Sequence, residues 1–192
     1  MARRSLSHSL IAFGFAAAGL AASLPAAAQV TVSVGGMAQA CSLAAKAGQA
    51  TQEALYVCSE ALVTEPLNQH DLYGTYVNRG TLYLVRNKSR RALQDFDTAK
   101  SGAPMLAEGL VNRGAALINL GRAAEAEPEI TKGIKMGAEE PEKAYYNRGL
   151  ARWWLEDFKG AYLDLRKAQE LKPSWPVPGQ VLVNFKVAPA AR

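Results

Sequence analysis

The sequence predicts an all-α protein built as a stack of helix-turn-helix repeats, and three observations support this fold class. The tripeptide Asn-Arg-Gly occurs at residues 78–80, 112–114 and 147–149, at steps of 34 and 35 residues. Apolar and small residues recur at fixed distances from each tripeptide, and a proline follows each unit. An internal period of this length is typical of solenoids, in which each repeat is one supersecondary unit.

Residues 1–28 are predicted to be a secretory signal peptide. Arg3 and Arg4 precede the apolar stretch 10–24, and small residues with an Ala-x-Ala pattern end at Ala28. This order of charge, apolar core and small residues is typical of export signals. The apolar stretch is short for a membrane span, which needs roughly 20 residues. The alternative is an uncleaved anchor, which would bring the protein into contact with the membrane.

The chain that remains after cleavage is weakly basic. It holds 20 basic and 17 acidic residues, a net charge of +3. This charge is too small and too interspersed to favour binding of nucleic acid, and export argues against it as well. Residues 29–36 are predicted to be an extended segment that ends in two glycines. The rest of the chain is long enough for one domain with its own core.

Each repeat unit is predicted to be a helical hairpin. A bulky apolar residue lies four positions before the glycine of each tripeptide, at Tyr76, Leu110 and Tyr145. Twelve positions after each glycine there is an alanine, four positions later a large apolar residue, and three positions later again a small residue. In the three units these residues are Ala92, Phe96 and Ala99; Ala126, Ile130 and Gly133; and Ala161, Leu165 and Ala168. Spacings of three and four place such residues on one face of a helix.

The ends of these helices are predicted from turn and proline signals. Polar or glycine-containing turns are expected at 86–89, 120–122 and 155–157. Pro104, Pro141 and Pro173 follow the three units, because proline cannot continue the hydrogen-bond ladder of a helix. The second unit departs from the pattern, with Pro128 inside its second helix and Gly133 in the place of alanine. A kinked or frayed helix is therefore expected there.

A fourth, degenerate unit is predicted upstream, so that residues 37–173 form eight helices in four hairpins. Residues 37–48 would be its first helix, and Ala54, Cys58, Ala61 and Pro66 continue the alanine, large, small and proline series. In this register Cys41 takes the place of the tripeptide arginines and Cys58 that of Phe96. Two cysteines in an exported chain indicate a disulfide, worth about 3 kcal/mol, with two buried thiols as the alternative.

Residues 174–192 are predicted to cap the last hairpin. Trp175, Val177, Leu182 and Phe185 are available to cover its apolar face. A short helix after Pro178 is the favoured form, although the alternation of apolar residues from 181 to 187 also fits a strand.

The repeat spacing resembles that of the tetratricopeptide repeat, a 34-residue helical hairpin with alanine, large apolar, alanine and proline at these offsets. The match covers residues 37–173, and it is best in the units of Gly80 and Gly149 and weakest in the first hairpin. The resemblance implies a right-handed superhelical stack with three clear units and one degenerate hairpin. It also indicates a small exported protein of the periplasm of a Gram-negative bacterium, with secretion as the less favoured location.

The resemblance further implies a concave groove, lined by the first helix of each unit, that holds a protein or peptide. The family uses the asparagine two positions before the repeat glycine to bond a peptide backbone, although this asparagine can also bond its own turn. Helical spacing supplies the other walls, so the predicted groove residues are Val77, Asn78, Leu84, Val111, Asn112, Ile118, Tyr146, Asn147, Leu150 and Trp153. Trp153 and its neighbour Trp154 are the candidate hot spots, with one of the two expected to pack in the core.

The groove is predicted to accept an apolar segment or an amphipathic helix. A clamp for a ligand's carboxyl end is disfavoured, because only Lys143 lies near the right place. The chain's own tail or a second copy of the protein could also fill the groove. A self-associating assembly component, and hence a homo-oligomer, is therefore the alternative to a binding module for another protein, whose identity the residues do not reveal.

No catalytic, cofactor or metal site is predicted. His70 is the one histidine after residue 28, and no cluster of metal ligands accompanies it in the sequence. An enzyme would require His70 to lie in a pocket with acidic or cysteine partners. The densest positive run, residues 88–91 with Lys88, Arg90 and Arg91, is interpreted as a solvated face, with an anion site as the alternative.

Overall fold

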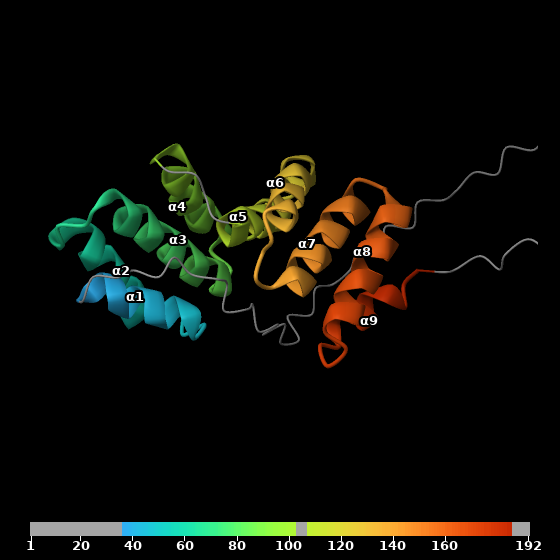
Figure 1. Cartoon of the computed structure of the whole chain (residues 1–192), viewed down its shortest axis with the longest axis horizontal. Coiled ribbons are helices and arrows are strands. Elements are labelled where there is room, and N and C mark those ends of the chain that lie inside the picture. Colours follow the sequence, from blue (N-terminus) through green and yellow to red (C-terminus); the bar gives the residue numbers. More distant parts are fainter. Residues whose placement is uncertain (1–35, 103–106, 186–192) are drawn as a thin grey trace, which may run out of the picture.

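The computed structural model describes residues 36–102 and 107–185, and throughout these ranges the regular elements are helices (Figure 1). They are α1 (Met37–Lys46), α2 (Gln52–Thr64), α3 (Gln69–Val85), α4 (Ser89–Gly102), α5 (Ala107–Asn119), α6 (Ala123–Lys135), α7 (Pro141–Trp154), α8 (Phe158–Leu171) and α9 (Val177–Leu182). The predicted signal peptide, residues 29–35 of the extended segment and Pro104 lie outside the described residues.

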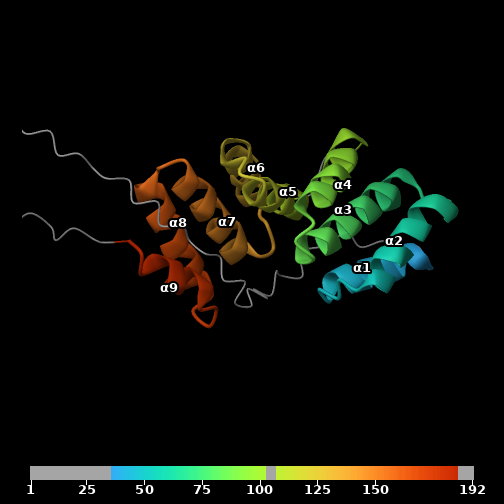
Figure 2. The same ribbon diagram turned by 180° about the vertical axis from the view of Figure 1, so that it is seen from behind.

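Consecutive helices pack as hairpins, α1 with α2, α3 with α4, α5 with α6 and α7 with α8. The hairpins follow one another along the long axis of the molecule, and both views show the same order (Figures 1 and 2). Each hairpin has an apolar face that it cannot bury alone, so stacking on its neighbours completes the core. The all-α repeat architecture predicted from the sequence is confirmed.

The tripeptide glycines occupy equivalent places, where the first helix of a hairpin meets the second. A β-carbon added to Gly80 would lie 2.8 Å from the ring of Phe96, and one added to Gly114 would lie 2.3 Å from Cγ1 of Ile130. At Gly149 the nearest atom is Cγ of Leu165, at 3.1 Å. Glycine therefore recurs because the large residue of the second helix fills the space of a side chain.

Gly114→Ala is expected to lower the free energy of unfolding by up to about 2 kcal/mol. Overpacking a core costs about 1–3 kcal/mol, and the better helix propensity of alanine offsets about 1 kcal/mol of it. Gly149→Ala is the matched control and should change the free energy by less than about 1 kcal/mol, because the contact at Leu165 is looser. Urea unfolding of both variants measures the difference, and equal losses would contradict this account of the packing.

The three turns inside these hairpins each contain one residue in the left-handed backbone conformation. Asn87, Gly121 and Glu156 have φ angles of 56°, 74° and 62°, and each lies seven residues after a tripeptide glycine. A single left-handed residue of this kind ends a helix by turning the chain away from it. The turns occupy 86–88, 120–122 and 155–157, and the first is one residue shorter than predicted because α4 begins at Ser89.

The second unit remains regular in spite of its departures. α6 runs from Ala123 to Lys135 without interruption through Pro128, so the predicted fraying does not occur. A β-carbon on Gly133 would lie 2.8 Å from the backbone oxygen of Ala107 on α5. Glycine replaces alanine there because α5 and α6 approach too closely for a methyl group.

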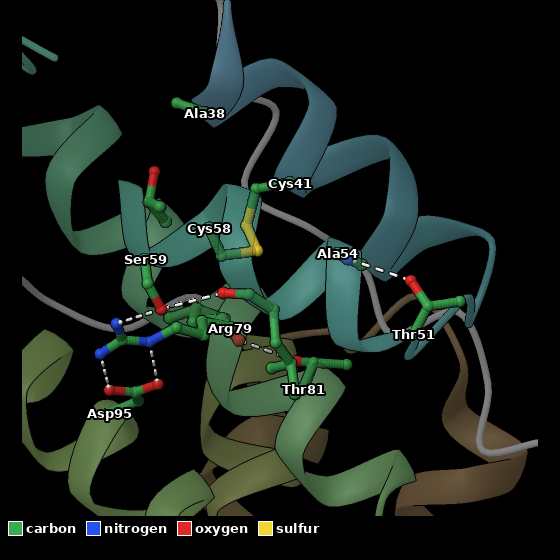
Figure 3. The surroundings of a disulfide bond; sticks show 12 residues. Ala38, Cys41, Thr51, Ala54, Cys58, Ser59, Arg79, Thr81 and Asp95 are labelled. Carbon is green, nitrogen blue, oxygen red and sulfur yellow. Dashed lines mark hydrogen bonds and ion pairs between the residues drawn. A yellow bond between two sulfur atoms is a disulfide. The ribbon is translucent and has the colours of Figure 1, made fainter. Parts of the chain in front are cut away.

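The disulfide between Cys41 and Cys58 forms as predicted and joins α1 to α2 (Figure 3). Both cysteines are fully buried and pack with Ala45 and Leu55. The Glu65 carboxylate, which follows α2, accepts hydrogen bonds from the backbone amides of Met37 and Ala38. A carboxylate at this place stabilises the positive end of a helix, so the first hairpin is closed by a covalent bond and a charged cap.

The tripeptide arginines bind an acidic residue on the second helix of their own hairpin. In each case that residue lies 16 positions further along the chain. The ion pairs are Arg79 with Asp95 at 2.7 Å, Arg113 with Glu129 at 3.5 Å and Arg148 with Asp164 at 2.8 Å. Arg79 and Arg148 bind their partners through two nitrogens, the geometry that makes guanidinium–carboxylate pairs strong.

The same arginines also reach the second helix of the preceding hairpin. Their acceptors are Ser59 at 3.1 Å from Arg79, Asp97 at 2.8 Å from Arg113 and Thr131 at 3.2 Å from Arg148. Figure 3 shows Arg79 between Ser59 and Asp95. Each arginine therefore joins three helices and couples one repeat to the next.

Candidate functional site

The candidate site is a hollow formed by the first helices of three successive hairpins, α3, α5 and α7, together with the segment that leads into α7. Its apolar lining comes from Leu84, Val85, Val111, Ala115 and Ala138. Its polar lining comes from Thr81, Glu108, Asn112, Glu140, Lys143 and Asn147. We refer to this set as the hollow. An apolar lining with a few polar groups is the usual make-up of a ligand site.

Two of the repeat asparagines lie in the hollow. The Asn112 amide donates a hydrogen bond of 3.2 Å to the Thr81 hydroxyl, which itself donates to the backbone oxygen of Val77. Within the described part of the chain the Asn147 side chain makes no hydrogen bond, and it is partly exposed. An amide both donates and accepts, so Asn147 can bond a peptide backbone in either direction.

Each charged group of the hollow has a partner, either another charge or a backbone amide. Lys143 is 8% exposed and binds Glu140, one turn before it. Burial lowers the pKa of Lys143 and raises the pKa of Glu140, because desolvation disfavours both charged forms. The buried Glu108 carboxylate accepts a hydrogen bond of 2.7 Å from the backbone amide of Glu139. The hollow therefore presents one buried cation that is already neutralised.

The predicted groove residues divide between the hollow and the interior. Leu84, Val111, Asn112 and Asn147 line the hollow, and Ile118 and Leu150 are half-buried. Val77 lies in the main core. Asn78 is fully buried on α3, against which α1 packs, and neither atom of its amide has a partner in the described residues. A buried amide without a partner costs stability, so Asn78 is a strained point of the first repeat interface.

The other two predicted residues, Tyr146 and Trp153, lie under the segment that follows α8. The Tyr146 ring meets that of Trp175 edge-on at 5.1 Å, and the Trp153 ring meets that of Phe185 at 4.6 Å. Burial raises the pKa of Tyr146. α9 packs on α8 with Val177 and Pro178 buried, so this end of the molecule is capped by a helix, the form favoured by the sequence. Trp154 remains 63% exposed.

Three charged residues of the hollow, Glu108, Glu140 and Lys143, were not among the predicted groove residues. Glu108 and Lys143 lie four positions before Asn112 and Asn147, one helical turn away on the same face. The spacing from the asparagines was therefore a signal for Glu108 and Lys143, and of these two only Lys143 was considered, as a position for a carboxyl clamp.

No group of three metal-ligating side chains comes together in the ranges 36–102 and 107–185. His70 lies at the surface with its Nδ1 atom 3.3 Å from the Asp71 carboxylate. None of the helices in these ranges has the length and apolar character needed to cross a bilayer.

The sequence and the fold were compared with those of known proteins. Residues 142–174 match the family model of the tetratricopeptide repeat. No curated protein matches the chain. Three solved structures share the fold at low identity. The first tetratricopeptide-repeat domain of human RPAP3 is 23% identical with a TM-score of 0.54, and the match covers 61% of this chain and 91% of that domain.

The second solved structure, the tetratricopeptide-repeat domain of Arabidopsis OM64, is 24% identical with a TM-score of 0.54, over 62% of this chain and all of that domain. The third, a MamA RS-1 ArsTM double mutant, is 23% identical with a TM-score of 0.59, over 77% of this chain and 82% of that one. At these identities the likeness concerns the fold alone.

Proposed function

We propose that this chain, whose repeats resemble the tetratricopeptide repeat, binds a protein or peptide in the hollow between α3, α5 and α7. The observation that carries the proposal is the juxtaposition of the Asn112 and Asn147 amides over an apolar lining. The amides would hold the backbone of the guest, and Leu84 and Val111 would receive its apolar side chains.

The pairing of Lys143 with Glu140 argues for a guest that enters by its apolar side chains rather than by a terminal carboxylate. A carboxylate would have to displace Glu140 from a buried site and would gain only one cation in exchange. An apolar segment needs no such exchange. We therefore propose that apolar contacts with α5 supply most of the binding energy of the guest, and that the Asn112 and Asn147 amides supply the specificity.

We place this activity in the periplasm, and the protein acts there without catalysis. The Cys41–Cys58 bond suits an oxidising compartment, which is where disulfides form and persist. The predicted signal peptide, residues 1–28, would direct export of the chain to this compartment.

Asn112→Ala combined with Asn147→Ala is expected to reduce capture of the guest from an envelope extract by roughly tenfold or more, since two hydrogen bonds are lost. The matched control combines Gln94→Ala and Asn184→Ala, which removes two exposed amides away from the hollow. Quantitative mass spectrometry of the captured proteins compares both variants with the unchanged protein. A guest that is lost equally from both variants, or from neither, would contradict binding in the hollow.

Self-association is the second candidate, and the contacts of Trp175 and Phe185 with α7 favour it. A segment that covers α7 of its own chain has the chemistry to cover α7 of another copy. Sedimentation of the protein over a concentration range distinguishes the two candidates. A constant monomer mass excludes self-association and leaves the hollow to a different protein.

A further inference from the structure

A second cavity, separate from the hollow, lies between α2, the end of α3 and the start of α4, and we call it the basic cavity. Its volume is about 230 Å³. Tyr56 and Gln52 of α2 line it on one side, Tyr83 of α3 on another, and Arg86, Lys88 and Arg91 surround it. Three of its lining residues are basic and none is acidic, which distinguishes it from the hollow, where Lys143 is paired with Glu140.

The cations of the basic cavity are not neutralised by the part of the chain that the structure describes. Arg86 donates a hydrogen bond of 2.9 Å to the backbone oxygen of Ala50, and neither it nor Lys88 nor Arg91 forms an ion pair with a described carboxylate. The arginines of the repeat interfaces behave differently, since each of them binds an acidic residue. Three neighbouring cations repel one another, so the cavity gains stability from any anion that enters.

The start of α4 adds to the positive potential. Its first turn contains Arg90 and Arg91 and no acidic residue, whereas the first turns of α2, α3, α5, α6 and α7 each contain one and those of α1, α8 and α9 contain none. Because the N-terminal end of a helix is positive, arginine is unfavourable there and an acid is favourable. Arg91 therefore lies at an electrostatically unfavourable position beside the basic cavity.

The aromatic walls hold the cations in position and offer flat surfaces. The guanidinium carbon of Arg91 lies 5.8 Å from the centre of the Tyr83 ring, and that of Arg79 lies 6.0 Å from it. Arg79 is itself fixed by Asp95 and Ser59. Tyr56 is 56% exposed and free to cover a guest. Tyrosine rings of this kind stack on planar groups.

We propose that the basic cavity binds a small organic phosphate monoester that carries a flat, ring-shaped body. A phosphate monoester has a charge of about −1.5 to −2 near neutral pH, which matches a set of three cations better than a single carboxylate does. Guanidinium groups donate two parallel hydrogen bonds to phosphate oxygens, and the ring of the guest would lie against Tyr83 and Tyr56. The volume is below the usual range of roughly 300–1,000 Å³ for drug-sized ligands, so a guest of single-ring size is implied.

Isothermal titration of the full chain with phenyl phosphate, inorganic phosphate and phenol tests the proposal. Phenyl phosphate is expected to bind saturably, inorganic phosphate about tenfold more weakly for lack of a ring, and phenol not measurably. Arg86→Gln with Arg91→Gln is expected to weaken phenyl phosphate at least tenfold. Lys132→Gln with Lys135→Gln removes the same charge from exposed positions of α6 and should leave binding within about twofold.

Backbone amide chemical shifts of the unchanged protein, measured by NMR during the titration, test the site without the use of variants. Phenyl phosphate is expected to move resonances of residues 52–59 and 83–92 and to leave those of α7 in place. The absence of saturable binding, equal weakening by the two double variants, or shifts confined to the hollow would each overturn the proposal. Tyr83→Leu is expected to remove the tenfold preference for phenyl phosphate over inorganic phosphate, and an unchanged preference would overturn the part assigned to the ring.

Discussion

Asp164→Asn is expected to lower the free energy of unfolding by about 3 kcal/mol, more than any other single polar substitution in the repeats. Asp164 is 4% exposed, and its carboxylate accepts hydrogen bonds from Nε and Nη2 of Arg148, each at 2.8 Å, and from Arg152 at 2.9 Å. Removing one partner of a buried ion pair costs about 3–5 kcal/mol, because the remaining charge stays buried without compensation. The lower end applies here, since the two guanidiniums keep some contact with water.

The cost at Asp164 is large because the two arginines cannot satisfy each other. Arg148 retains one hydrogen bond, to the Thr131 hydroxyl, and the face of the Tyr145 ring, and Arg152 retains Glu127 and Asp157. The bond to Asp164 is the main reason that the pKa of Arg148 is raised, so the cation is held strongly in its charged form. Asparagine keeps the shape of the side chain but removes the charge, and the loss is therefore electrostatic rather than a loss of packing.

Asp97→Asn is the matched control, with the same chemical change at an exposed place. The Asp97 side chain is 51% exposed and its partner Arg113 keeps Glu129, so the expected loss is below about 1 kcal/mol. Urea unfolding of both variants, together with Arg148→Met alone and combined with Asp164→Asn, completes a double-mutant cycle. Additive losses in the cycle, or equal losses at Asp97 and Asp164, would show that the buried pair does not couple the helices.

The hairpins could be predicted from the sequence because their packing repeats. Gly80 meets Phe96 in the same way that Gly114 meets Ile130, and a contact made at each unit leaves a period that a single sequence displays. The turns could be predicted for the same reason, since a left-handed residue is required at the same offset each time. The Cys41–Cys58 bond was predicted from the same register, applied one unit further upstream.

The arginine bridges were visible in the same register and were not recognised. An acidic residue lies 16 positions after each tripeptide arginine, yet no ion pair was predicted between them. A buried arginine needs a carboxylate partner on a neighbouring helix, and this requirement would have predicted the pairs. The partners on the preceding hairpin, Ser59, Asp97 and Thr131, differ in chemistry and share only their position, so they carry a weaker signal.

The groove could be predicted only in part, because its two ends depend on contacts outside the repeat pattern. Asn78 is buried since the degenerate hairpin brings α1 onto α3, and Tyr146 and Trp153 are covered since the tail supplies Trp175 and Phe185. The ring contacts made by Trp175 and Phe185 come from the tail, which lies outside the repeat pattern. Asn112 lies on α5, which has a hairpin on either side, and the hollow that it lines with Asn147 remains a predicted binding site.

Cys41→Ala combined with Cys58→Ala is expected to lower the free energy of unfolding by about 3 kcal/mol, with the loss concentrated in the first hairpin. The two cysteines are 17 residues apart, and the chain-entropy account gives about 3 kcal/mol for a loop of this length. α1 has few other attachments, since its buried residues are two alanines, one serine and Cys41 itself. Hydrogen exchange should therefore show lost protection in α1 and α2 and unchanged protection in α7 and α8, because repeats contact only their neighbours.

Reduction of the unchanged protein separates the covalent bond from the packing of the two sulfur atoms. A thiol fills nearly the same volume as the sulfur of a disulfide, so reductant should reproduce most of the loss of protection in α1 and α2 without leaving a cavity. The double variant has no bond to reduce, and reductant should not affect its stability. If reductant destabilises both proteins equally, the effect does not come from this disulfide. If it changes neither while thiol titration finds both cysteines free, the first hairpin is held by its stacking on α3 and by the Glu65 cap instead.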